Sequence, residues 1–149
     1  MSKIKSTIIL ILITMIANIG IAQVKTDVDY EYLLAQSEMD SKADVTVNSV
    51  GWGVGAFLAS IVASPLLGGG LTVIMAGNVS GVTVPASRRQ VIMEKYPNSP
   101  DPFNYYKDKY ITNYTQLKKK GQRSAAWKGV GAGFIVNLIL VMNALSDME

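Results

Sequence analysis

The chain has 149 residues, and it contains neither cysteine nor histidine. This composition excludes disulfides, thiol nucleophiles, histidine acid–base chemistry and the common zinc ligand sets. The formal net charge of +3 hides a strong segregation, because Val45 to Ser87 is a run of 43 residues without Asp, Glu, Lys or Arg. An apolar run much longer than about 20 residues is typical of a membrane-spanning segment. We therefore predict a small all-α membrane protein.

Residues 1–22 have the pattern of an export signal. Lys3 and Lys5 precede an apolar run, and small residues at Gly20 and Ala22 come directly before Gln23. The apolar run is short for a span, so we expect cleavage before Gln23, with an uncleaved anchor as the alternative.

Residues 23–50 form an acidic segment that we place on the non-cytoplasmic side. Residues 23–44 carry six acidic residues against two lysines. Apolar residues recur there with an imperfect helical period, which predicts a short amphipathic helix over about 28–43. We interpret it as a solvated lead-in, with a docking helix as the alternative.

Residues 51–75 are predicted to be the first transmembrane segment, with a length of about 37 Å as a helix. Pro65 and the run Gly68 to Gly70 disturb a straight helix. One kinked span fits this length better than a hairpin, whose arms would be short for a crossing. The alternative is a hairpin with Leu66 to Leu71 at its tip.

Residues 76–128 are predicted to be a cytoplasmic loop. Ten Lys and Arg residues stand against three acidic residues in 88–128, which indicates the inside of a membrane. Asp101 followed by Pro102 predicts the start of a tyrosine-rich helix that runs to about Lys120, and Gly121 suggests a break.

Residues 129–145 are predicted to be the second span, followed by a tail of residues 146–149. Small residues repeat every fourth position in both spans, a spacing that lets helices approach closely in lipid. Asn137 is expected to form a hydrogen bond across a helix interface. The predicted helix-packing residues are Gly51, Gly55, Ala59, Ala63, Gly129, Gly133 and Asn137. The alternative is that small residues are simply common in membrane helices.

Aromatic and basic residues close to the spans are predicted to lie at the membrane interface, where lysines reach anionic lipid headgroups. They are Trp52, Trp127, Lys118, Lys119, Lys120, Tyr106, Tyr110 and Tyr114. The tyrosines share one helix face that leads into a span, which favours a bilayer or a neighbouring helix. A protein-docking face is the next alternative, and nucleic-acid binding fits this spacing poorly.

Several motifs occur together in one order: Ser64-Pro65-Leu66, Tyr96-Pro97, the spaced tyrosines, the lysine cluster 118–120, and Trp127 before a glycine-rich last span. In this the chain resembles an uncharacterised family of small bacterial membrane proteins that carry an export signal. The resemblance implies the location, which is the bacterial inner membrane, and the architecture. It implies no activity.

No catalytic, cofactor or metal motif stands out, and Asp101 and Asp108 are interpreted as a helix cap and a solvated charge. We therefore expect a non-enzymatic structural or interaction component that packs through small-residue helix faces. The alternative is a membrane-permeabilising or pore-forming oligomer. The expected partners are the lipid bilayer, its anionic headgroups, and a second copy or another membrane protein. We expect no nucleic acid and no cofactor.

Overall fold

The structure is a computed structural model that describes residues 28–147. Helices make up 81% of this part of the chain, and it contains no strand, which confirms the all-α prediction. The predicted export signal, residues 1–22, lies outside the described residues.

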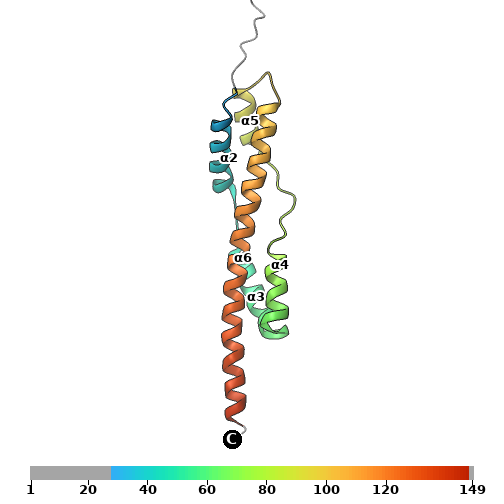
Figure 1. Cartoon of the computed structure of the whole chain (residues 1–149), viewed down its shortest axis with the longest axis vertical. Coiled ribbons are helices and arrows are strands. Elements are labelled where there is room, and N and C mark those ends of the chain that lie inside the picture. Colours follow the sequence, from blue (N-terminus) through green and yellow to red (C-terminus); the bar gives the residue numbers. More distant parts are fainter. Residues whose placement is uncertain (1–27, 148–149) are drawn as a thin grey trace, which may run out of the picture.

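One long helix, α6, forms the axis of the molecule, and the shorter elements pack along it (Figure 1). The elements are α2 (Tyr30–Asp44), α3 (Ser49–Ala63), the π-helical turn η1 (Pro65–Gly69), α4 (Gly70–Met75), α5 (Ala86–Lys95) and α6 (Asp101–Ser146). We call α2, α5 and residues 101–120 of α6 the head. We call α3, η1, α4 and residues 121–146 of α6 the apolar half.

The head is held together by a small aromatic and aliphatic core. Its buried side chains are Leu33, Ile92, Tyr96, Tyr106 and Tyr110. The helix predicted over 28–43 is present as α2, which begins where the Asp29 carboxylate accepts a hydrogen bond from the Tyr32 amide at 2.8 Å. Its buried face is mostly polar, with Leu33 as the one apolar member. Polar partners must therefore supply much of the contact between α2 and α6.

The first apolar segment is a hairpin and not the single kinked span that we favoured. The Asn48 side chain caps α3, and the helix ends at Ala63 because Ser64 has a φ of 82°, outside the helical region. The chain then reverses through η1, so that Ala76 after α4 packs beside Ala56 of α3. Figure 1 shows α4 returning along α6 from this turn. We call Ser49–Met75 the hairpin. Its first arm, the 15-residue helix α3, is only about 22 Å long, too short for a hydrocarbon core of about 30 Å.

Glycine at the turn allows the two arms to meet. A Cβ on Gly68 would collide with the Ala59 carbonyl, and one on Gly69 would lie 2.6 Å from the Ser60 Oγ and 2.8 Å from a Val130 methyl. Both glycines are therefore required by close approach of the backbone, and not only by the bend.

Helix α6 continues without interruption through Gly121, so the predicted break there is wrong. A Cβ on Gly121 would lie 2.7 Å from a Val47 methyl. Glycine at this position thus makes room for the α2–α3 connection. Among the described helices, α6 is the one long and apolar enough on its own to cross a membrane.

The acidic and basic segments lie on the same side of the apolar half. Arg88 of α5 forms ion pairs with Asp40 and Asp44 of α2. Groups in direct ionic contact must share one side of a bilayer, so the structure does not have the opposite-side arrangement that we expected.

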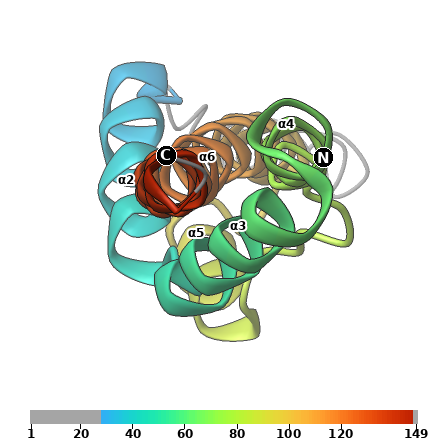
Figure 2. The ribbon, with the colours of Figure 1, turned by 90° about the horizontal axis from the view of Figure 1, so that it is seen from below.

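In Figure 2, which looks along α6 from its C-terminal end, α2 and α4 lie on different sides of this axis.

Candidate functional site

The apolar half is built on a close contact between α3 and α6. A Cβ on Gly129 would collide with the Gly53 carbonyl, and one on Gly133 would lie 2.7 Å from the Ser60 Cβ. The Asn137 amide donates to the Ser60 carbonyl at 2.9 Å. The predicted packing residues of α6 thus lie in an interface within the chain.

The predicted stripe on α3 is not the face that packs there. Gly55 is exposed, with nothing within 4 Å of the Cβ it lacks, and Ala63 is exposed as well. Gly51 is exposed and faces its own cap at Asn48, while the Ala59 carbonyl borders Gly68 in the turn. The face toward α6 is formed by other residues of α3, namely Gly53, Ala56, Phe57 and Ser60. Small residues occur on two faces of α3, and the face that contacts α6 is the one with Gly53, Ala56 and Ser60.

Buried polar side chains of the apolar half are bonded within the chain. The Ser60 and Thr72 hydroxyls donate to the carbonyls of Ala56 at 2.7 Å and Gly68 at 2.8 Å. With its amide oriented to satisfy both ends, Gln122 donates to the Ala76 carbonyl at 2.9 Å and accepts from the Trp52 indole at 3.2 Å. Over residues 28–147, the one buried side-chain nitrogen or oxygen without a partner is the Asn113 Nδ2, in the head. Internal pairing of this kind is what a lipid environment requires.

The outer surface of the apolar half is covered by large apolar side chains, each more than half exposed. They are Val54, Leu58, Val62, Leu66, Leu67, Leu71, Ile74, Met75, Phe134, Ile135, Leu138, Ile139, Leu140, Val141, Met142 and Leu145. From Leu138 onward every described residue of α6 is exposed, and Figure 1 shows these last turns extending beyond the hairpin. A soluble monomer rarely exposes so large an apolar surface.

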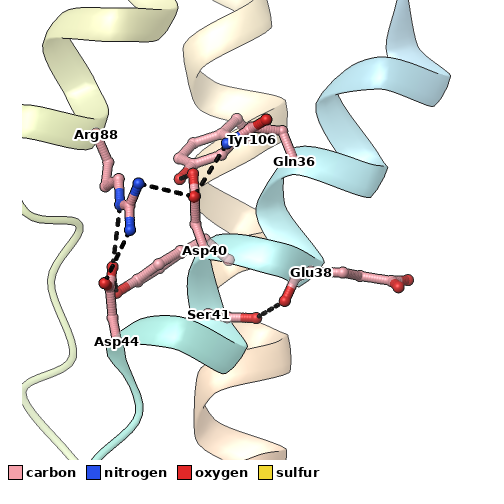
Figure 3. Close-up of polar contacts among 8 residues, drawn as sticks. Gln36, Glu38, Asp40, Ser41, Asp44, Arg88 and Tyr106 are labelled. Carbon is pink, nitrogen blue, oxygen red and sulfur yellow. Dashed lines mark hydrogen bonds and ion pairs between the residues drawn. The ribbon is translucent and has the colours of Figure 1, made fainter.

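The head contains a partly buried polar cluster that sequence reasoning missed (Figure 3). We call Asp40, Asp44, Arg88, Tyr106 and Tyr110 the clasp. Arg88 lies between the two carboxylates, at 2.9 Å from the Asp40 Oδ1 and 3.1 Å from the Asp44 Oδ1. The Tyr106 hydroxyl donates to Asp40 at 2.7 Å and the Tyr110 hydroxyl donates to Asp44 at 3.1 Å. The clasp therefore joins α2, α5 and α6.

Tyr106 and Tyr110 are consequently not interfacial residues, which corrects our expectation. Their exposed fractions are 0% and 1%. Tyr114 is half-buried and stacks on Tyr110 with ring centroids 6.0 Å apart. The helix face of Tyr106 and Tyr110 packs against α2, because the two hydroxyls donate hydrogen bonds to two carboxylates that lie one helical turn apart.

The other predicted interfacial residues lie where the head meets the apolar half. Trp127 is 61% exposed, and Trp52 is half-buried beside Gln122. Lys118 and Lys119 are half-buried and Lys120 is exposed. Their position is compatible with an interface, although nothing in the geometry requires one.

The clasp makes stability depend on pH in both directions. Hydrogen bonds from Arg88 hold the pKa of Asp44 below its ordinary value of 3.8. Burial, together with the hydrogen bonds to Asp40 and Asp44, raises the pKa of Tyr106 and of Tyr110 well above 10. Because the carboxylate of Asp44 is favoured in the folded state, its contribution to stability is present above pH 3.8 and is lost as the pH falls below that value. The tyrosines favour the neutral form, so their contribution is lost as the pH rises past about 10.

We therefore expect the free energy of unfolding of the head to be nearly constant around neutral pH and to fall at both extremes. Chemical unfolding followed by tyrosine absorbance at pH 3, 7 and 10.5 measures this directly. Asp44→Asn is the control for the acidic side. A decline below pH 4 that is just as steep in this variant would contradict the role assigned to Asp44.

Comparisons of the chain with protein-family models, with curated proteins and with solved structures found no match. The class of protein therefore follows from the geometry alone. The chain is all-helical, its head is joined by the clasp, and its apolar half contains one helix long and apolar enough to cross a membrane.

Proposed function

We propose that the chain is an integral membrane protein with one spanning helix and one re-entrant hairpin, which acts as a non-enzymatic structural or interaction component of a membrane. The observation that carries this proposal is the division of the surface. Large exposed apolar side chains cover the apolar half, while its buried polar side chains are hydrogen-bonded inside it. The resemblance to small bacterial membrane proteins supports the inner membrane as the location.

The spanning element in this proposal is the C-terminal part of α6. Residues 129–145 carry no charge, and Lys128 and Asp147 flank them. The hairpin accompanies only the first turns of this span, so it enters the bilayer from the side of the head and returns to it. A re-entrant backbone is tolerated in lipid when other protein covers it, and the contact between α3 and α6 provides that cover.

A non-enzymatic role fits the clasp as well. Both oxygens of each carboxylate are occupied: those of Asp40 by Arg88, Gln36 and Tyr106, and those of Asp44 by Arg88 and Tyr110. A carboxylate that is fully engaged in structural bonds is a poor general base. The pore-forming alternative lacks support from the helix that would line a pore, because Asn137 is used within the chain.

Three single-cysteine variants test the topology, since the chain has no cysteine of its own. Met39→Cys lies in α2 of the head, Ser99→Cys lies in the loop that joins α5 to α6 within the head, and Ser146→Cys lies at the far end of α6. With a membrane-impermeant thiol reagent on sealed vesicles, we expect the two head positions to react from one side and residue 146 to react from the other.

The competing arrangements give different patterns of labelling. Two full spans would place residues 39 and 146 together and residue 99 opposite, which would overturn the proposal. Equal labelling of all three without opening the vesicles would mean that α6 does not cross the membrane. Labelling after detergent treatment is the control that shows each cysteine to be reactive.

A further inference from the structure

Five cations gather where the head meets the apolar half, and we call them the collar. They are Lys118, Lys119, Lys120, Arg123 and Lys128. Along α6, no acidic residue occurs between Asp108 and Asp147. The ion pairs found over residues 28–147 are those of Arg88 with Asp40 and Asp44, so the collar is not neutralised within this part of the chain.

The collar extends over about 15 Å of α6, from Lys118 to Lys128, and contacts with three elements place its middle. Gly121 faces Val47 before α3, and Gly77 after α4 faces the Arg123 guanidinium. Gln122 joins Trp52 to Ala76 at the same level. Below this level, α3, α4 and α6 all expose large apolar side chains. The apolar surface on three separate segments therefore begins beside the stretch of α6 that carries the collar.

An open groove between α3 and α6 lies at this level, with a volume of about 510 Å³. Val47, Val50 and Gly53 line it on one side, and Ser124, Ala125 and Lys128 line it on the other. Its polar side chains are thus the Lys128 ammonium and the hydroxyls of Ser49 and Ser124, beside an apolar floor. This combination suits a phosphate that is attached to an acyl chain.

Resting on the proposed membrane insertion, we infer that the collar and this groove bind the headgroups of anionic phospholipids on the leaflet that faces the head. Unpaired cations attract phosphates in that leaflet, and the attraction falls off within about one Debye length, roughly 10 Å. A free phosphate would be recognised by the same ammonium groups but would gain nothing from the valines. The apolar floor therefore selects lipid.

The two tryptophans of the chain report on this binding, since Trp52 and Trp127 both lie at the level of the collar. The full-length protein is reconstituted into bilayers of phosphatidylcholine in which a fraction of either brominated phosphatidylcholine or brominated phosphatidylglycerol quenches tryptophan. We expect stronger quenching by the brominated phosphatidylglycerol at equal mole fraction, with a preference of several-fold.

Two matched double variants then locate the effect. Lys120→Gln with Lys128→Gln removes two exposed collar cations, and Lys107→Gln with Lys109→Gln removes two exposed cations of the same helix. Lys109 lies about 16 Å along α6 from Lys120, more than one Debye length. The collar variant should lose most of this several-fold preference for phosphatidylglycerol, while the head variant should keep it.

Three results would overturn the inference. Equal quenching by the two brominated lipids would show that the collar has no lipid preference. A preference that survives in the collar variant, or that falls equally in the head variant, would place the binding elsewhere. Relief of the preference by millimolar sodium phosphate would show a site for free phosphate. If neither lipid quenches tryptophan, the proposed membrane insertion itself has failed, which distinguishes the two hypotheses.

Discussion

Replacing Gly129 with leucine is expected to separate α3 from α6 and to lower the free energy of unfolding by about 3 kcal/mol or more. Even the Cβ of alanine would collide with the Gly53 carbonyl, and it would lie 3.0 Å from the Phe57 amide nitrogen. Both of these atoms belong to the backbone, so neither can move aside by changing a rotamer. The strain must therefore be relieved by moving one helix away from the other.

Gly131→Leu is the matched control, because Gly131 lies on the same helix two residues away. It is exposed and has nothing within 4 Å of the Cβ it lacks. There the substitution should be neutral or slightly stabilising, since leucine favours a helix by roughly 0.8 kcal/mol over glycine. Reversible unfolding in mixed micelles measures both variants. Equal tolerance of leucine at the two positions would show that α3 and α6 are not in the contact described.

Gly55→Leu extends the same comparison to α3. The spacing of small residues predicts that this substitution disrupts packing, whereas the structure leaves the position open. The sequence contains small residues at both 51, 55, 59 and 53, 56, 60, and either set can form a close-packing face. Which set is used depends on how α3 is rotated against α6, and no local pattern encodes that rotation.

The starts of α2 and α6 could be predicted, since they depend on local signals, whereas α5 was not predicted. Asp101-Pro102 marks the start of α6 to within one residue, and α2 begins within two residues of its predicted start. The predicted cap is wrong, because Asp101 is already helical and the N-cap position is Pro100. Pro65 and Gly68 to Gly70 indicated the turn of the hairpin. The preference for one span came from the length of the whole apolar segment, and length does not reveal that the chain reverses at Ser64.

The clasp has a pattern in the sequence, but this pattern can be recognised only when the order and directions of the helices are known. Asp40 and Asp44 are one turn apart on α2, and Tyr106 and Tyr110 are one turn apart on α6. Both hydrogen-bonded pairs have a sequence separation of 66, because α2 and α6 run in the same direction. Matched spacing of acceptors and donors is the signal, but it is shared by many helix pairs. The hairpin decides that these two meet, by returning the chain to the head before α6 begins.

Replacing Arg88 with methionine is expected to detach α5 and to cost about 2–3 kcal/mol in the free energy of unfolding of the head. Methionine keeps an unbranched apolar stem and removes the charge and the three polar contacts with the two carboxylates. The Asp40 side chain, with an exposed fraction of 8%, then remains buried without a counter-ion. Breaking a fully buried ion pair typically costs 3–5 kcal/mol, and the smaller figure reflects the 33% exposure of the Arg88 side chain.

Arg89→Met is the control, since it makes the same chemical change one residue along α5. Arg89 is exposed, and its guanidinium carbon lies 5.4 Å from the centroid of the Phe103 ring, a contact worth roughly 0.5–1 kcal/mol at such a site. Hydrogen exchange measured by mass spectrometry should show lost protection over residues 86–95 in Arg88→Met and near-native protection in Arg89→Met. If the two variants exchange alike, α5 is held by its apolar contacts through Ile92 and Tyr96, and the clasp is not what fixes it to the head. The same pair of variants separates the head from the apolar half, because no clasp residue lies in α3 or in residues 121–146 of α6. The cysteine labelling pattern should therefore be unchanged in both variants.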